Sequence, residues 1–400
     1  MANSQIPEFT CVGRERPSWT QLAVLLASGA LSSAAGSMVA PVFPEVIDTL
    51  KVSPWWAGWL VSIHTLTLAL ATPLLGLAAG RLGHRRVLVG SLVGYALFGV
   101  LGSWSQHFGT MFLCRAMVGF ASGGIAAVSI GVLSSLYHGS ARTKMMGYVT
   151  SALASSTVFF PLLGGWVGSQ NWRYAFWLHG TALPVAIAAL LFLQVPAALH
   201  PLNGDLKNNA ALVNLVQRRG VIAIFLALAL ASALFYVVVV YAPLYLKAAM
   251  NAPPLINGTV LATRAIGAAV VSAFGATKLA HWLGARTAIA LGFFLMSLSL
   301  FTIPLVLTPT LIVVSALPFG IGFGIVMPNL YDRLSTYAPT AQQTVLLGLG
   351  TGISSLGQFL SPALFGPAWA MVQEGIFFVA AGCGFSLCLV TALRQQQSPE

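Results

Sequence analysis

Two residues of this sequence that could do chemistry lie inside apolar stretches. His64 occurs in SIHTLTLAL, and Arg115 opens RAMVGFASGG. A histidine titrates near physiological pH, so it can carry a proton or hydrogen-bond a bound molecule. An arginine at this depth costs about 3 kcal/mol unless it is paired. These residues therefore indicate a proton-coupling or ligand-binding site.

Each of the two residues also has a structural interpretation. A neutral His64 between helices could simply hydrogen-bond a serine or the backbone. Arg115 could extend along its helix to the outer headgroups of a membrane. Both interpretations stay open from the residues alone.

Two of the eight acidic residues, Glu45 and Asp48, follow the first apolar segment and its prolines Pro41 and Pro44. Outside a membrane they would be ordinary solvated loop residues. If the helix tilts, they enter the outer end of a transport pathway, where a low dielectric favours the protonated form of a carboxylic acid. They are candidate proton sites in that case.

Aromatic and amide side chains follow in the second half of the chain. If they converge with the residues above, they would suit an amphipathic organic molecule, although packing is the alternative role for the aromatic ones. Arg115 and Arg264 would give such a cavity a positive charge, which favours an anionic or zwitterionic substrate over a lipophilic cation. The candidate substrate-binding residues are His64, Arg115, Ser37, Met38, Phe235, Tyr236, Arg264, Phe319 and Gln358.

The sequence contains no motif for nucleotide binding, metal binding or nucleophilic catalysis. The chain has no GxxxxGK[ST] nucleotide loop, no metal-spaced His/Cys set and no nucleophile elbow, so we expect no enzyme activity, no metal and no cofactor. The four cysteines are scattered and are expected to act as small buried hydrophobes. The net charge of +11 is interpreted as a membrane-topology signal rather than a nucleic-acid-binding surface.

The elements that position these residues must be membrane helices. Hydrophobic residues make up 57% of the chain and charged residues 7%, whereas about 25% charged is typical of soluble domains. A spanning helix needs about 20 apolar residues. The predicted spans are 19–40, 54–79, 87–104, 109–136, 145–168, 174–195, 219–243, 256–280, 288–306, 310–331, 342–366 and 372–393.

The twelve spans form two copies of one unit. Gly83 and Gly284 lie 201 positions apart, and the same offset relates Pro161 to Pro362 and Gly165 to Gly366. Repeats of this size in an apolar chain suggest a transporter. The predicted parts are a tail (1–18), a first six-helix bundle (19–196), a linker (197–218), a second bundle (219–394) and a final tail (395–400).

Lys and Arg set the orientation, because they are retained on the cytoplasmic side. With the N terminus inside, the external loops hold only Lys51, Arg173 and Lys247, and the other loops hold most of the basic residues. We therefore expect both termini in the cytoplasm and a multi-pass protein of a bacterial inner membrane. The expected partners are lipid, protons and a small-molecule substrate, and nothing in the fold requires more than a monomer.

The stretch GLAAGRLGHRR resembles the loop between the second and third helices of the major facilitator superfamily. In that family the position of Gly80 is usually Asp, which meets a helix N terminus of the other half and locks the cytoplasmic side. This chain lacks that carboxylate. RAMVGFASGG resembles the family's fourth helix, and the resemblance implies a proton-coupling role for Arg115. The residues of the loop are Gly76, Gly80, Arg81, Gly83, Arg85 and Arg86.

GYVTSALASSTVFFPLLGG resembles the fifth-helix motif of the superfamily's antiporters, with Ser156 and Phe160 in place of two glycines. NWRYAFW, which follows, resembles an external turn of the drug:proton antiporters. The resemblance implies an all-α integral membrane fold of twelve helices in two pseudo-symmetric six-helix bundles. Its conformational residues in this chain are Gly147, Pro161, Gly164, Gly165 and, in the second copy, Pro362.

The function expected from these features is export of a small organic compound, drug-like or an amphipathic metabolite, by proton antiport with alternating access. Proton coupling would involve Arg115, His64 and Glu45 or Asp48. The alternative is a proton-independent uniporter or an importer on the same fold, which the absence of an acid deep within a helix supports. A third alternative is an intramembrane enzyme or a receptor that reuses the fold.

Overall fold

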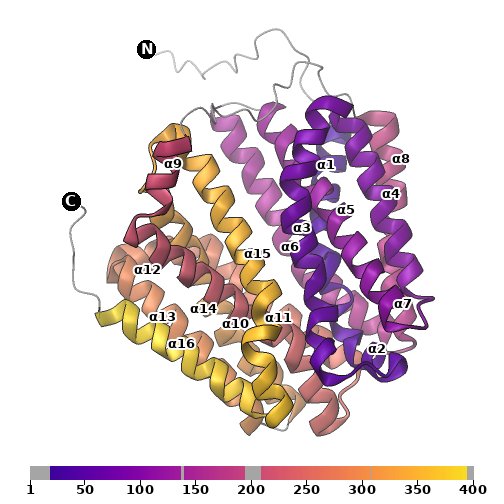
Figure 1. Ribbon diagram of the computed structural model, residues 1–400, viewed down its shortest axis with the longest axis vertical. Helices are drawn as coiled ribbons and strands as arrows, with labels where there is room; N and C mark the ends of the chain where they lie inside the picture. The colour runs from indigo at the N-terminus through magenta and orange to yellow at the C-terminus, as the bar shows by residue number, and fades with distance from the viewer. Residues whose placement is uncertain (1–18, 137–138, 194–208, 307, 394–400) are drawn as a thin grey trace, which may run out of the picture.

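The computed structural model describes residues 19–136, 139–193, 209–306 and 308–393, which are almost entirely helical (Figure 1). No strand occurs in these ranges. Both predicted tails and residues 197–208 of the predicted linker lie outside the described residues. The rest of the linker contains a short helix, so it is not wholly a loop.

The first half of the chain forms α1 (Trp19–Ser37), η1 (Ala40–Val42), α2 (Phe43–Leu50), α3 (Pro54–Leu82), α4 (His84–Gly102), α5 (Phe108–Leu136), α6 (Gly139–Gly168), α7 (Trp172–Trp177), η2 (Leu178–Thr181) and α8 (Ala182–Phe192). The second half forms α9 (Asn209–Val216), α10 (Arg219–Met250), α11 (Pro254–Phe274), α12 (Ala276–Leu283), α13 (Ala285–Thr302), η4 (Ile303–Leu305), α14 (Pro309–Ser335), α15 (Thr340–Met371) and α16 (Gly375–Leu393).

The all-helical membrane fold expected from the sequence is confirmed. Among the described residues, eleven helical stretches are long and apolar enough to cross a membrane. The remaining predicted span, 342–366, lies on α15, which is not one of these eleven. This 32-residue helix contains many Gly, Ser, Thr and Gln residues among its apolar ones.

Several predicted spans are interrupted, among them the sixth, which divides into α7, η2 and α8. The first helix ends at Ser37 rather than continuing to residue 40, and the chain then turns through η1 into α2. Pro41 and Pro44 lie in this segment and cannot donate backbone hydrogen bonds to a continuing helix. The eighth span divides at Gly275 into α11 and α12.

The sequence repeat is also a structural repeat. Gly83 joins α3 to α4 with φ of 96°, and Gly284 joins α12 to α13 with φ of 82°. Glycine adopts such positive φ values without the steric cost that other residues have. Pro161 and Pro362 lie inside α6 and α15. The two halves meet through equivalent pairs of helices, since α6 packs on α11 and α15 packs on α3.

The two ends of the bundle differ in how the halves pack. In Figure 1 the start of α1 and α9 lie at the top, here called the α9 side, and α2 lies at the bottom, here called the α2 side. One buried cluster joins the end of α1, η1, α2 and the start of α3 to the second half. A separate cluster is confined to the first half, from Leu22 to Leu193. The halves therefore share an apolar core toward the α2 side.

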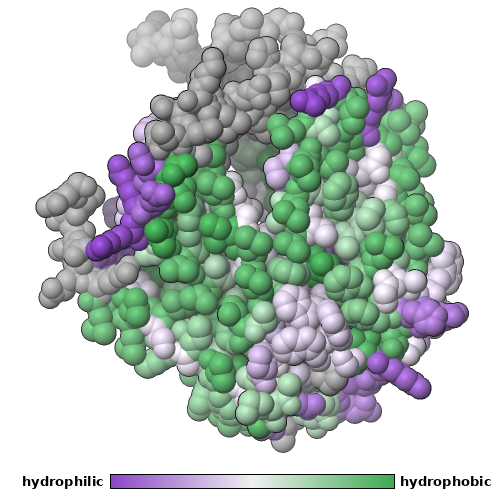
Figure 2. All heavy atoms as spheres, in the orientation of Figure 1, coloured by the Kyte–Doolittle hydropathy of each residue, from purple (hydrophilic) through white to green (hydrophobic). Residues whose placement is uncertain are grey.

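Large apolar side chains cover the outside of the helices. Leu70, Leu74 and Leu77 form a stripe on α3, and more than half of each side chain is exposed. Figure 2 shows apolar residues over most of the middle of one face and hydrophilic residues near its edges. This distribution suits contact with lipid around the middle of the molecule.

Candidate functional site

Arg115 lies on α5 and points into the interior of the first half, with 1% of its surface exposed. Nη1 donates to the carbonyl oxygen of Ala35 at 3.1 Å, and Nη2 donates to that of Val61 at 3.4 Å. Ala35 belongs to the last turn of α1, whose carbonyls lack helical partners and carry the negative end of the helix dipole. The buried position rules out the alternative in which Arg115 reaches the headgroups.

His64 lies beside Arg115 and faces the second half. Its Nδ1 is 2.8 Å from Nη2 of Arg115 and 2.8 Å from the carbonyl oxygen of Val61. Its Nε2 is 3.4 Å from the hydroxyl oxygen of Tyr236 on α10. A guanidinium can only donate and a carbonyl oxygen can only accept, so Nδ1 bonds Arg115 in one tautomer of the neutral ring and Val61 in the other. In the tautomer that accepts from Arg115, the proton of the neutral ring is on Nε2, which faces Tyr236.

Small residues make this arrangement possible. A Cβ on Gly119 of α5 would overlap the carbonyl oxygen of His64, and a Cβ on Gly36 of α1 would overlap its ring. Close approach of backbones at small residues is typical of packed membrane helices. Gly36 and Gly119 therefore let α1 and α5 enclose the imidazole.

Arg264 lies on α11 and has 6% of its surface exposed. Nη1 donates to the carbonyl oxygen of Phe235 at 3.2 Å, and Cζ lies 3.9 Å from the centre of the Phe235 ring. Phe235 stacks on Phe323 at 4.6 Å between centroids. Nε of Arg264 has no hydrogen-bond partner among the described residues.

A cavity of about 670 Å³ lies between the halves, next to both groups. It reaches from Ala40 and Pro161, which are buried, to Thr150 and Ala273, which are exposed. It therefore opens toward the α9 side. The residues that line it are apolar, small or hydroxyl-bearing for the most part, and no Asp or Glu is among them.

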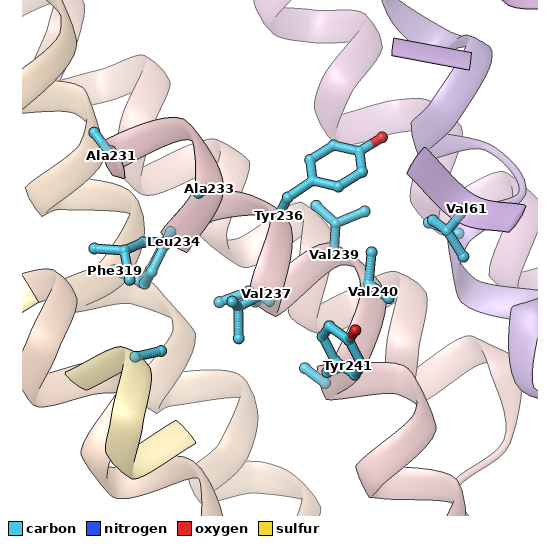
Figure 3. Packing of buried hydrophobic residues seen from close by; sticks show 14 of the residues in the cluster. Val61, Ala231, Ala233, Leu234, Tyr236, Val237, Val239, Val240, Tyr241 and Phe319 are labelled. Atoms are coloured by element: carbon cyan, nitrogen blue, oxygen red, sulfur yellow. The ribbon is translucent and has the colours of Figure 1, made fainter. Parts of the chain in front are cut away.

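The structure brings most of the predicted substrate residues to this cavity. Those that line it are Ser37, His64, Phe235, Tyr236, Arg264 and Gln358. Arg115 lies behind His64. Met38 and Phe319 are fully buried away from the lining, and Phe319 lies 6.0 Å from Cζ of Arg264. Figure 3 shows Tyr236 projecting from α10 toward the side on which Val61 lies, whereas Phe319 lies on the opposite side of α10.

The two acidic candidates lie outside the cavity, on α2. Glu45 Oε1 is 3.3 Å from Nζ of Lys247 on α10, so this ion pair joins the two halves on the α2 side. Asp48 is exposed. The solvated interpretation therefore describes Asp48, and Glu45 is an inter-half contact.

The motif of α6 closes the α2 side. A Cβ on Gly164 would overlap the carbonyl oxygen of Met38, and one on Gly165 would lie 2.6 Å from that of Pro254 on α11. On α11, a Cβ on Gly258 would likewise overlap the carbonyl oxygen of Pro161 on α6. Asn257 Nδ2 also donates to the carbonyl oxygen of Pro41 at 3.1 Å. Gly147, by contrast, has open space beside it.

The loop motif lies on the α9 side. Gly80, Arg81, Arg85 and Arg86 are all exposed there, beside the turn at Gly83. Gly76 makes only an ordinary contact with Ala127, at 3.6 Å from a built Cβ.

Sequence reasoning missed His179, which is 1% exposed on η2. Its Nδ1 lies 2.9 Å from the carbonyl oxygen of Phe176, and its ring lies 4.9 Å from that of Tyr95. The available signal was a lone ionisable residue in an apolar span. Among the described residues, no group of three or more His, Cys, Asp or Glu is placed to hold a metal ion.

Residues 25–362 match the family described as Major Facilitator Superfamily. An uncharacterised MFS-type transporter of Mycobacterium tuberculosis is 31% identical over 180 residues, which cover 44% of this chain and 26% of that protein. The multidrug transporter protein MdtP of Bacillus subtilis is 27% identical over 198 residues, 48% of this chain and 35% of that protein. The matches thus span about a quarter to a third of these relatives.

The fold is similar to that of solved transporters. The crystal structure of the nucleoside transporter NupG matches 94% of this chain and 100% of its own, with a TM-score of 0.79 and 14% identity. At that identity the likeness concerns the fold.

Proposed function

This chain belongs to the major facilitator superfamily of membrane transporters, and we propose that it exports a small organic compound, drug-like or an amphipathic metabolite, in exchange for protons. The observation that carries the proposal is the buried chain from Arg115 through His64 to Tyr236. It borders the cavity and connects the first half to the second. A titratable ring at such a junction can link protonation to the relative position of the halves.

The coupling step follows from the geometry of His64. In the described state its Nδ1 lies against Nη2 of Arg115 at 2.8 Å. A ring protonated on both nitrogens would place two cations in contact and leave Nδ1 unable to accept from Arg115, so protonation favours a ring position away from Arg115. Movement of the ring changes its contact with Tyr236 on the other half. Proton binding and substrate binding then favour different arrangements of the two halves.

The distribution of basic residues orients this cycle. Arg81 lies in the last turn of α3, Arg85 and Arg86 lie at the start of α4, and Arg286 lies at the start of α13, all on the α9 side. Lys51, Arg173 and Lys247 lie at the α2 side. By the positive-inside rule the α9 side faces the cytoplasm of the proposed bacterial inner membrane, and both termini lie there. The described state is then open to the cytoplasm, where an exporter takes up its substrate.

The unit of movement in this proposal is the six-helix half. The proposed bundles are residues 19–196 and 219–394, as expected from the repeat. Their contacts on the α2 side, α6 with α11 and α3 with α15, would separate when the cavity opens outward. The name of another relative, the MFS-type efflux pump MMF1 of Pseudozyma antarctica, supports export as the direction.

The test is uptake of a panel of drugs, dyes and metabolites into inverted membrane vesicles, with and without an inside-acid gradient. We expect gradient-driven accumulation in the native protein and its loss in His64→Asn and Arg115→Ala. His107→Asn is the matched control, because His107 is exposed outside the cavity. Accumulation that survives in both His64→Asn and Arg115→Ala would refute the coupling role of these residues.

A proton-independent uniporter or importer is the second candidate. The cavity lining contains no carboxylate, which is the usual proton carrier within membranes. The similar fold of a nucleoside transporter is an example of this architecture in a protein that transports another kind of solute. Equilibration of a compound that is unaffected by the gradient would favour this candidate.

A further inference from the structure

We propose that Arg264 anchors the charged group of an organic anion in the cavity, so that the transported compound is an amphipathic carboxylate or sulfonate. This inference rests on the proposed transport function and names its substrate class. It starts from an arginine that has 6% of its surface exposed and that lines the cavity. It also has unused donors.

The hydrogen bonds of Arg264 leave most of its capacity free. A guanidinium has five N–H donors. Among the described residues, Nη1 bonds to the carbonyl oxygen of Phe235 and Nε has no partner. No carboxylate lies within ion-pair distance of it in the part of the chain that the structure describes. A counter-charge stabilises a buried cation that has unused donors, and the cavity is the available place for one.

The surroundings of Arg264 present it to a planar anion. Cζ lies 3.9 Å from the centre of the Phe235 ring, so the aromatic ring occupies one side of the guanidinium. Edges of the guanidinium then remain for a carboxylate, which binds such a fork through two parallel hydrogen bonds. The Phe235 and Phe323 stack offers an apolar surface beside the charge for the rest of the compound.

Arg115 is not an alternative anchor. Its Nη1 and Nη2 are used by the carbonyls of Ala35 and Val61 and by His64, and it does not line the cavity. The structure thereby divides the two arginines between different roles. Arg115 holds the titratable ring, and Arg264 faces the ligand.

The size and the lining of the cavity also suit an amphipathic anion. Its volume of about 670 Å³ is within the range of small-molecule sites. Gln358 and several hydroxyl groups line it, and no Asp or Glu does. An organic cation would meet a positive charge without a counter-charge, whereas an anion would neutralise the site.

The experiment is a binding measurement on the purified full-length protein in detergent, without any gradient. The probes are naphthalene-2-carboxylate, its carboxamide and naphthalen-2-ylmethylammonium, which share one ring system and differ in charge. We expect the carboxylate to bind at least about tenfold more tightly than the carboxamide, because hydrogen bonds between charged groups are about twice as strong as neutral ones. The ammonium should bind more weakly still.

Variants identify the residue responsible. Arg264→Gln should abolish the preference for the carboxylate, and Arg264→Lys should retain part of it. Lys278→Gln removes the same charge from an exposed position of α12 and should leave the preference unchanged. If Arg264→Gln does not fold, the relative affinities of the three probes for the native protein and for Arg264→Lys still test whether Arg264 binds the anion.

The proposal is overturned if the carboxamide binds as tightly as the carboxylate, if the ammonium binds more tightly, or if the carboxylate does not bind. It is also overturned if Arg264→Gln folds and keeps the preference. Because binding is measured without a gradient, a preference for the anion together with gradient-independent transport would reject antiport and retain the anchor. Gradient-driven transport without a preference for the anion would retain antiport and reject Arg264 as the anchor.

Discussion

The hydroxyl oxygen of Tyr236 on α10 lies 3.4 Å from Nε2 of His64 on α3, and this contact joins the two halves of the transporter beside the cavity. On its other side, His64 is held by Nη2 of Arg115 at 2.8 Å. The imidazole is therefore bounded by a cation that belongs to its own half and by a hydroxyl that belongs to the other. A change in its protonation alters both contacts at once.

The first prediction removes the contact between the halves. Tyr236→Phe deletes one hydroxyl group and keeps the ring, so we expect cavity shape to persist and proton-driven accumulation to fall. Uptake into inverted vesicles across a range of lumenal pH measures this. Tyr245→Phe is the control, since its hydroxyl bonds the carbonyl oxygen of Pro304 away from the cavity. Equal pH dependence in both variants would contradict a coupling role for Tyr236.

The second prediction concerns the exposed Gly80 on the α9 side. Gly80→Asp restores the carboxylate typical of the family, which we expect to favour the state closed on that side. A charge near a helix terminus contributes about 0.3–1 kcal/mol, so the shift should be about two- to fivefold. The measurement is labelling of Thr150→Cys, a cavity position, in a background without the four natural cysteines.

Gly80→Asn is the matched control for that experiment, because it has the same shape without the charge. Labelling should slow in Gly80→Asp and remain fast in Gly80→Asn. Identical labelling rates in the two variants would mean that the absent carboxylate has no effect on the conformational equilibrium.

The third prediction tests the closure of the α2 side. A Cβ on Gly258 would overlap the carbonyl oxygen of Pro161, so Gly258→Ala should destabilise this packing by about 1–3 kcal/mol, as overpacking generally does. We expect the population to move toward a state open on the α2 side. Labelling of a cysteine at Ser37 from that side should become faster, and transport should slow.

Gly147→Ala is the control for Gly258→Ala, because a Cβ there meets no atom within 4 Å. It should leave labelling and transport unchanged. If Gly258→Ala behaves like Gly147→Ala, the α6 and α11 contact does not hold the α2 side closed.

The fourth prediction follows from the charge of the proposed substrate. Export of one anion for one proton moves two charges per cycle, and each is driven by about 2.3 kcal/mol per 100 mV. A lumen-positive potential, set with potassium and valinomycin in inverted vesicles at equal pH, should therefore drive accumulation of a transported carboxylate. Uptake that does not change with the membrane potential would rule out the exchange of one anion for one proton.

The sequence alone determined the membrane class, the approximate positions of the spans and the repeat, because a bilayer requires about 20 apolar residues per span. For the same reason His64 and Arg115 were visible as unusual residues within apolar spans. The glycine turns at Gly83 and Gly284 were equally visible, and the structure gives both positive φ.

The pairing of these residues depended on tertiary structure. Spacing places a residue on a face of its helix, but it does not say which neighbour that face meets. Close packing at Gly36 and Gly119 brings His64 against Arg115, 51 positions away. The same kind of packing turns Arg264 into the cavity, leaves Met38 and Phe319 outside it, and closes the α2 side. These outcomes depend on contacts between helices far apart in the chain, which no local pattern contains.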